Sequence, residues 1–183
     1  MSKSLAVPLS APYAERLSFQ SYAPAPPIEG VWTHPLCKHR SSNGALMEFL
    51  RIGPNGIVGL PSSLEPKQVN VSWAAPGRIN AFHVHVRYHQ DELWTVPHGS
   101  LLVWLADMRK GSPTEGIRRK LVLCAEQPAL VHIPTGVAHG YRAGHEGAIL
   151  LYAADAQFDP EDPNEGRIPW DVFGADIWED DRG

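Results

Sequence analysis

Three histidines and a glutamate stand in this chain at spacings that suit acid–base or metal chemistry. His83 and His85 are separated by one residue, Glu92 lies on the next predicted strand, and His139 follows a Pro-x-Gly turn. Because side chains of a strand alternate faces, His83 and His85 point the same way if their segment is a strand. Imidazole titrates near neutral pH and also binds transition metals, so the pattern predicts a general base or a divalent metal site.

The metal interpretation uses Zn, Fe, Mn or Ni as the candidate ion, since imidazoles with a carboxylate suit all four. The candidate ligands are His83, His85, Glu92 and His139. Gln90 lies two residues before Glu92 and is a rival for its place. Glu92 can instead form an ion pair with Arg87 or Arg109. A histidine on a strand can also be an ordinary hydrogen-bonded residue, so these alternatives stay open.

Turn signals divide the chain into short runs that are typical of strands. The sequences Gly53-Pro54-Asn55-Gly56 and Ala75-Pro76-Gly77 are two such turns, and the chain holds 17 prolines and 16 glycines. Without a convincing amphipathic helix, this spacing predicts an all-β sandwich or barrel. The segment 168–178 is predicted as a last strand or a short helix. The other predicted strands cover 45–52, 68–73, 79–86, 92–96, 100–106, 120–124, 129–133 and 148–153.

Length and charge narrow the classes of protein and partner. The chain has 183 residues, enough for one domain, and a formal net charge of -4, so no basic field predicts binding to nucleic acid or to an anionic membrane surface. No apolar run approaches a membrane span, and the first residues lack the apolar core of a signal peptide. We therefore expect a cytoplasmic protein with Cys37 and Cys124 reduced, and a small molecule as its partner.

The chain divides into three parts. Residues 1–40 are predicted as an irregular arm with an edge strand, because the Pro-rich run at 23–27 fits neither a helix nor a central strand. Residues 41–178 form the predicted barrel, and the acidic residues 179–183 a solvated tail. Within the barrel, Trp73, Trp94 and Trp104 are expected in the core or the pocket wall. The remaining histidines are expected at the surface: His34, His39, His89, His98, His132 and His145.

Two motifs resemble the cupin family. The first runs from Gly77 to Gly99 through His83, His85 and Glu92, and the second is Pro134-x-Gly136-x-x-His139. The resemblance implies a double-stranded β-helix, the jelly-roll barrel. The motifs are more specific for this fold than for a bound metal.

A closer resemblance, from Asn43 to Trp178, is to the dTDP-4-dehydrorhamnose 3,5-epimerase family. Its most recognisable string is Asp107-Met-Arg109-Lys-Gly-Ser-Pro-Thr, and the closing Ile168-x-Trp170-Asp171 also matches. The family's cupins are metal-free, so the resemblance implies no cofactor. It also implies a homodimer in which the N-terminal arm crosses between subunits.

Catalytic roles follow from the same resemblance. His83 would remove a proton next to a sugar ketone, Tyr152 would return one from the opposite face, and His139 or Asn70 would stabilise the enolate. Arg109 has a second interpretation, a structural ion pair with Asp107. The expected substrate contacts are Asn70, Asn80, Gln90, Trp94, Glu48 and Arg109.

This chain also departs from the family. Asn80 and Asn43 replace arginines, Glu92 replaces a lysine, and Phe158 replaces a tyrosine. The C-terminal aspartate that orients the family's base lies beyond the matched segment and is absent. These changes weaken binding of a dianionic diphosphate and predict a divergent member with a singly charged or neutral substrate.

Three functions are therefore weighed. The first is a sugar or sugar-nucleotide epimerase or isomerase that acts on a small carbonyl or carbohydrate substrate through His83 and Tyr152. The second is a metal-dependent cupin oxygenase, isomerase or lyase. The third is a cupin that binds a small molecule without catalysis.

Overall fold

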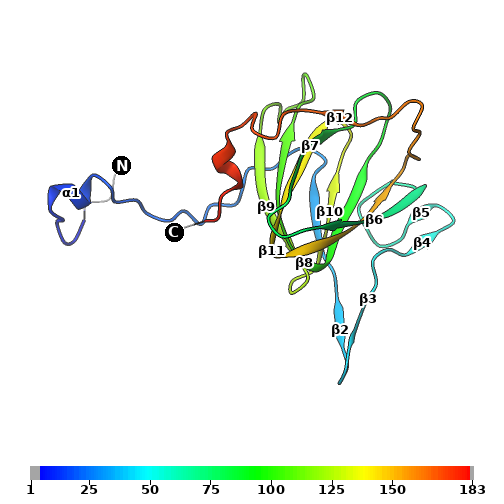
Figure 1. Ribbon diagram of the computed structural model, residues 1–183, viewed down its shortest axis with the longest axis horizontal. Helices are drawn as coiled ribbons and strands as arrows, with labels where there is room; N and C mark the ends of the chain where they lie inside the picture. The colour runs from blue at the N-terminus through cyan, green and yellow to red at the C-terminus, as the bar shows by residue number, and fades with distance from the viewer. Residues whose placement is uncertain (1–4, 182–183) are drawn as a thin grey trace.

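The computed structural model describes residues 5–181 and shows an antiparallel jelly roll with one extended arm (Figure 1). The strands of the main sheet hydrogen-bond in the order β1 (Trp32–Pro35), β10 (Ala129–Ile133), β8 (Glu92–Asp107), β11 (Val137–Ala154), β7 (Ile79–Val84) and β12 (Gly166–Arg167). Two further strands, β6 (Gln68–Ala74) and β9 (Arg118–Cys124), pair with β11 and β8. The prediction of an all-β fold is confirmed.

Two long bent strands, β8 and β11, organise the sheet. The sequence predicts separate strands over 92–96 and 100–106 and a strand that begins at 148, but β8 and β11 continue through Gly99 and Gly147. Both glycines have positive φ, at 69° and 73°, and a Cβ on Gly99 would lie 2.0 Å from the carbonyl oxygen of Gly147. The two strands therefore bend where they cross, which lets each contribute side chains to the pocket and to the core.

Apolar side chains of these strands fill the interior. The larger core cluster includes Leu105 on β8, Val131 on β10 and Leu150 on β11. A smaller cluster packs Phe82 of β7 against Trp178. Trp178 belongs to a short 3-10 helix, η1 (Ala175–Trp178), so the predicted last element is a short helix that follows the two-residue strand β12.

Residues 5–40 attach to the sheet only in part. Residues 5–27 are exposed and hold one helical turn, α1 (Ala11–Ala14), whereas Ile28 is buried and β1 pairs with β10. The strands β2 (Lys38–Arg40) and β3 (Ala45–Met47) then form a hairpin that projects from the body (Figure 1). The expected start of the barrel at residue 41 falls inside this hairpin.

A second small hairpin follows, in which β4 (Ile52–Gly53) pairs with β5 (Gly56–Ile57).

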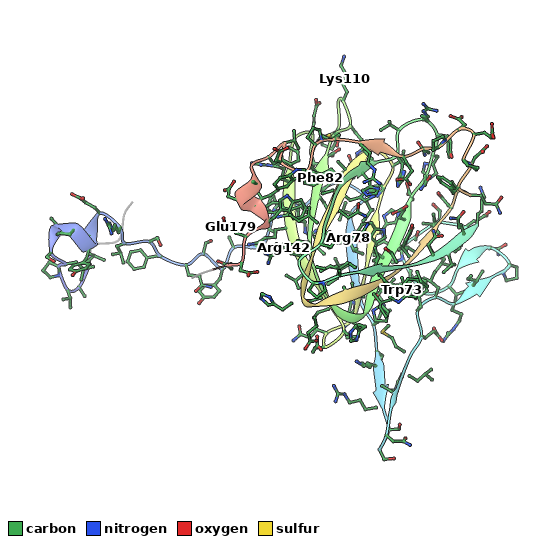
Figure 2. All side chains as sticks on the ribbon, viewed as in Figure 1. Trp73, Arg78, Phe82, Lys110, Arg142 and Glu179 are labelled. Atoms are coloured by element: carbon green, nitrogen blue, oxygen red, sulfur yellow. The ribbon has the colours of Figure 1, made fainter. Side chains whose placement is uncertain are left out.

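Two side chains differ in burial from the prediction. His132 was expected at the surface but is buried, stacked on Trp32 at 5.1 Å with Nδ1 bonded to the carbonyl of Gly30. Trp73 was expected inside but is 68% exposed at the end of β6 (Figure 2). Within residues 5–181, no helix is long and apolar enough to cross a membrane.

Candidate active site

One pocket opens between the strands that carry the histidines. Its inner part has a volume of about 80 Å³ and its outer part about 440 Å³, and His83, Glu92, Tyr152 and Glu165 line both. The outer part has the size of small-molecule sites, which run from roughly 300 to 1,000 Å³. A ligand larger than a few atoms that reaches His83 must therefore extend outward.

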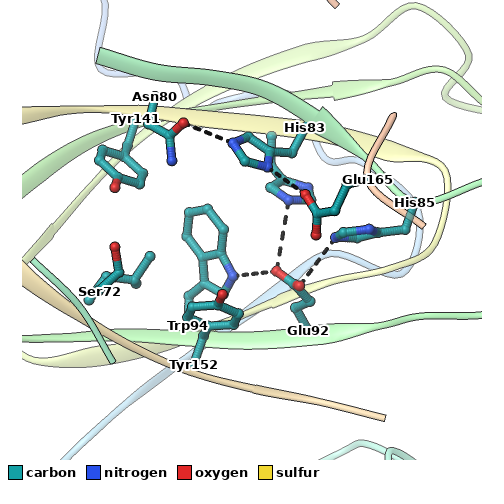
Figure 3. A pocket seen from close by; sticks show the side chains of 11 residues that line it. Ser72, Asn80, His83, His85, Glu92, Trp94, Tyr141, Tyr152 and Glu165 are labelled. Carbon is teal, nitrogen blue, oxygen red and sulfur yellow. Dashed lines mark hydrogen bonds and ion pairs between the residues drawn. The ribbon is translucent and has the colours of Figure 1, made fainter. Parts of the chain in front are cut away.

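His83 lies on β7 with both ring nitrogens engaged by side chains. Nδ1 is 3.0 Å from Glu165 Oε2, and Nε2 is 3.0 Å from Asn80 Oδ1 (Figure 3). Arg167 Nη1 donates to the same Asn80 oxygen at 3.2 Å, which fixes the side of the amide that faces the ring. Both neighbours of His83 are thus acceptors, and the imidazolium form satisfies both bonds. A substrate must replace Asn80 at Nε2 before that nitrogen can act as a base.

Tyr152 lies on β11, on the wall opposite His83 (Figure 3). Burial, with the nearby charges of Glu92 and Glu165, raises the pKa of Tyr152 to about 12. Its hydroxyl is therefore protonated at neutral pH and has a proton to donate. The placement of a carboxylate-bound imidazole and a protonated phenol across one cavity suits proton removal on one face and proton return on the other.

The other two histidines surround Glu92 in the buried end of the pocket. His85 Nε2 is 3.1 Å from Glu92 Oε1, and His139 Nε2 is 3.8 Å from Glu92 Oε2. Each ring donates its Nδ1–H to a backbone carbonyl, at 2.6 Å for Asn164 and 3.0 Å for Val137. These bonds fix both rings with Nε2 toward the carboxylate.

The three groups of this cluster titrate differently. Burial raises the pKa of Glu92, but hydrogen bonds from His85 and Trp94 outweigh it and lower the pKa to about 2. Burial opposes the charged form of His85, yet Glu92 prevails and raises its pKa. Burial dominates at His139 and lowers its pKa to about 4. Glu92 is therefore an anion at neutral pH and His139 is neutral, while Glu92 favours the charged form of His85.

Most of the expected site residues line this pocket. Asn80 and Trp94 lie in the inner part, and Asn70 and Gln90 in the outer part. Trp94 donates Nε1–H to Glu92 at 2.6 Å, so its polar edge holds the carboxylate.

Two expected substrate contacts are corrected. Arg109 is bonded to Asp107 at 2.8 Å and lines neither part of the pocket, and the exposed Glu48 pairs with Arg51. Glu92 pairs with neither of the arginines considered for it, because Arg87 bonds to Asp162 and Arg109 to Asp107.

Sequence reasoning missed Glu165, which supplies the carboxylate that was judged absent. Backbone hydrogen bonds of 3.0 Å in both directions join Phe82 to Ile168, so the segment before Ile168 runs beside β7. Asn164 fastens it further, since its side chain bonds to the backbone of Val86 and Tyr88. The match at Ile168 was the available signal, but nothing in the spacing revealed the pairing with β7.

Comparison with known proteins supports the same fold and chemistry. The family model described as dTDP-4-dehydrorhamnose 3,5-epimerase matches residues 26–178. Over 145 residues the chain is 37% identical to the spore coat polysaccharide biosynthesis protein SpsL of Bacillus subtilis, covering 79% of this chain and 91% of the relative. It is 32% identical over 147 residues to the "Probable low-salt glycan biosynthesis epimerase Agl13" of Haloferax volcanii, covering 80% and 90%.

A solved structure agrees with these relatives. The crystal structure of a dTDP sugar isomerase from Desulfovibrio desulfuricans superposes with a TM-score of 0.69 at 25% identity, over 79% of this chain and 87% of that one. The expected cupin jelly roll is confirmed.

Proposed function

The chain belongs to the dTDP-4-dehydrorhamnose 3,5-epimerase family, whose members are isomerases, and we propose that it epimerises a nucleotide-linked 4-keto sugar with His83 as base and Tyr152 as acid. The observation that carries this proposal is the arrangement of His83, backed by Glu165, across one cavity from Tyr152. SpsL and Agl13 are both named for polysaccharide or glycan biosynthesis, which supports a sugar as the substrate.

The reaction follows from the two residues. His83 Nε2 takes the proton from the carbon next to the ketone, the C–H electron pair enters an enolate, and Glu165 stabilises the imidazolium. Tyr152 then donates its proton to the opposite face of that carbon, which inverts the centre. Solvent restores the proton of Tyr152 and removes the proton of His83, so the cycle needs no oxidant or reductant.

One cationic side chain of this pocket is available to bind the substrate's diphosphate. Among the described residues that line its two parts, Arg167 is the only lysine or arginine. It lies on β12, across from His83 in strand register. The family match favours a nucleotide-linked sugar over the singly charged or neutral substrate expected from the sequence, so we assign its diphosphate to Arg167, which takes over from the arginines and lysine replaced in this chain.

Deuterium exchange tests this proposal. With a dTDP-linked 4-keto-6-deoxy sugar in D₂O, we expect the wild type to exchange the hydrogen beside the ketone, as followed by NMR. Tyr152→Phe should exchange hydrogen but epimerise at least about a hundredfold more slowly, because the base survives and the acid is lost. Wild-type protein that exchanges no hydrogen in such sugars would overturn the proposal.

A second candidate function, metal-dependent chemistry, rests on the cluster around Glu92. One atom each of His85, Glu92 and His139 lies within 4.8 Å of the others, and all three residues are buried. Backbone carbonyls fix both imidazoles with Nε2 toward the carboxylate, as in metal sites with oriented histidines. His83, expected as a fourth ligand, lies outside this cluster and bonds to Glu165 and Asn80.

Metal analysis separates the two candidates. If the second applies, protein purified without a metal column retains about one Zn, Fe, Mn or Ni per chain, and His85→Ala loses it. His83→Ala is the matched control and should retain the metal. A metal-free wild type that binds none of the four ions in calorimetry excludes this candidate.

A homodimer is the proposed assembly, and an apolar stripe on β6 supports it. The inward residues Asn70 and Ser72 line the pocket, whereas the outward Val69, Val71 and Trp73 are 55%, 46% and 68% exposed. Only β11 pairs with β6 in the described chain, so the strand leaves an unpaired edge. Such a stripe on an edge strand favours burial against a second copy.

The assembly is testable in solution. We expect wild-type protein to elute at twice the chain mass in light-scattering chromatography and Val71→Lys to shift it toward the monomer. Val122→Lys, at another exposed valine, is the control. A monomeric wild type would contradict the assembly.

A further inference from the structure

Tyr141 carries a buried hydroxyl that no part of the proposed reaction uses. The residue is 2% exposed, and its Oη has no hydrogen-bond partner among the described residues. It nevertheless lines the inner pocket together with His83 and Tyr152. A buried polar group is almost always bonded, so an unpaired one inside a pocket points to a ligand atom as its partner.

The neighbour of Tyr141 is a second donor. Asn80 lies opposite Tyr141 in the pairing of β7 with β11, and both side chains lie at the same end of the cavity (Figure 3). The Oδ1 of Asn80 is occupied by His83 and Arg167, whereas its Nδ2 makes no hydrogen bond within the described chain. A phenol and an amide N–H therefore share one wall, and neither carries a charge.

Apart from these two groups, the neutral donors of the inner part are the hydroxyls of Ser72 and of Tyr152, the proposed acid. Its carboxylates, Glu92 and Glu165, would repel a developing oxyanion, and Arg167 lines only the outer part. Trp94 N–H is bonded to Glu92, and the imidazole of His139 is held with its N–H toward a backbone carbonyl. The inner wall at Tyr141 and Asn80 is thus the place where negative charge on a carbonyl oxygen can be met by donors.

We propose that the Tyr141 hydroxyl, with the Asn80 amide beside it, binds the ketone oxygen of the substrate and stabilises it as the enolate forms. This inference rests on the proposed epimerase function and adds its oxyanion site. As His83 takes the proton, the C–H pair becomes the C=C bond, the carbonyl pair moves to oxygen, and Tyr141 O–H donates to that oxygen without losing its proton. A neutral donor pair thus does this work in an inner pocket that no described lysine or arginine lines.

Tyr141→Phe tests the assignment because it removes one oxygen atom and little else. We expect deuterium exchange beside the ketone to slow by about a hundredfold or more, mainly in kcat, since the donor acts on charge that appears in the transition state. The melting temperature should stay equal or rise, because a buried unpaired hydroxyl is removed.

The matched control is Thr95→Val. Thr95 is fully buried, and its hydroxyl likewise has no partner in the described chain, but it does not line the pocket. This variant should share any gain in stability and keep wild-type exchange. Exchange by Tyr141→Phe within about threefold of the wild type, while the control is normal, overturns the assignment.

A ligand that binds without reacting tests the oxyanion site separately from the proposed epimerase function. p-Nitrophenolate places an oxyanion on a six-membered ring, and its absorbance reports binding. We expect Tyr141→Phe to weaken its binding about tenfold or more and Thr95→Val to leave it unchanged. If wild-type protein exchanges no sugar hydrogen but binds the phenolate through Tyr141, the epimerase function fails and the oxyanion site stands. Equal phenolate binding by wild type and Tyr141→Phe overturns the site.

Discussion

His83 and the pair formed by His85 and His139 share one pocket but are held in opposite ways. His83 contacts the side chains of Glu165 and Asn80, and its own side chain is 17% exposed. His85 and His139 donate Nδ1–H to backbone carbonyls, and their side chains are 3% exposed. One end of the pocket is therefore built from movable partners and the other from fixed ones.

The difference in hydrogen-bond partners suits His83 for proton transfer and suits His85 and His139 for holding the Glu92 carboxylate. A carboxylate partner such as Glu165 stabilises a histidine that gains a proton, and a side chain such as Asn80 can make way for a substrate. A backbone carbonyl keeps the proton on Nδ1 and leaves Nε2 to face Glu92. We therefore expect substitutions at the His83 end to change catalysis and substitutions at the Glu92 end to change stability or ion binding.

The largest effect should follow His83→Asn. Removal of the base should lower the rate of deuterium exchange by about a thousandfold, within the range of general-base catalysis, and leave the melting temperature within a few degrees of the wild type. NMR time courses measure the exchange rate, and thermal denaturation measures the melting temperature. His139→Asn should instead lower the melting temperature and change the exchange rate little. It opens a gap beside Trp94, on which the His139 ring packs at 5.1 Å. Equal losses of activity and stability in both variants would erase the distinction between the two ends.

Glu92→Gln should give the next effect, a loss of stability. The variant removes the anion that His85 and Trp94 hold in a buried site, which costs about 3–5 kcal/mol of the free energy of unfolding. The pKa of Glu92 is lowered from 4.5 to about 2, so its contribution is complete above pH 4.5 and is lost as the pH falls toward 2.

Denaturant unfolding of Glu92→Gln and wild type from pH 7 to pH 2, with chelator present, measures that difference. It should be largest from about pH 4.5 to 6.5, where Glu92 is ionised and His85 is protonated, and should shrink as the pH falls toward 2. Asp171→Asn, at an exposed carboxyl group, is the control and should show no such trend. A constant difference across the range would mean that the charge of Glu92 contributes nothing.

The sequence predicts the histidine end of this molecule better than its carboxylate end. His83, His85 and His139 could be placed in one pocket because strand alternation is a local rule and because two motifs mark the strands. Glu165 could not, since its position depends on a two-residue strand, β12, whose pairing with β7 no local pattern encodes. Long-range register is the part of a β fold that a single sequence leaves open.

Burial was harder to predict than position. Trp73 is exposed because β6 is an edge strand whose outward face meets no other part of the described chain, and edge status is a property of the whole sheet. His132 is buried because the arm residues before β1 cover it and Trp32 stacks on its ring. Tyr141 lies two residues after the second cupin motif, and only the packed strands reveal that its hydroxyl has no partner in the described chain.

Glu165→Gln sharpens the comparison at the His83 end, with a smaller effect than loss of the base itself. The hydrogen bond from His83 holds the pKa of Glu165 below its usual value, so the carboxylate is ionised through the working range of pH. A neutral amide stabilises the imidazolium less, and we expect exchange to slow by about 10- to 50-fold. Glu165→Asp should recover part of the rate, and an unchanged exchange rate in Glu165→Gln would show that the carboxylate serves structure alone.

The smallest effect is expected for Arg167→Gln. This variant tests whether the His83 end of the pocket extends to a binding site for the diphosphate. Arg167 contacts Asn80 and lines the outer pocket, so its charge can reach a diphosphate while the reacting carbon lies at His83. The affinity for dTDP should fall by about tenfold and lose much of its salt dependence, with kcat nearly unchanged, as titration calorimetry and steady-state rates can measure. Arg167→Lys should restore most of the affinity if charge is what matters, whereas Arg78→Gln, at an exposed position outside the pocket, should change nothing. If Arg167→Gln instead lowers kcat and leaves the affinity intact, Arg167 acts through Asn80 on the base, and the anion must be bound elsewhere.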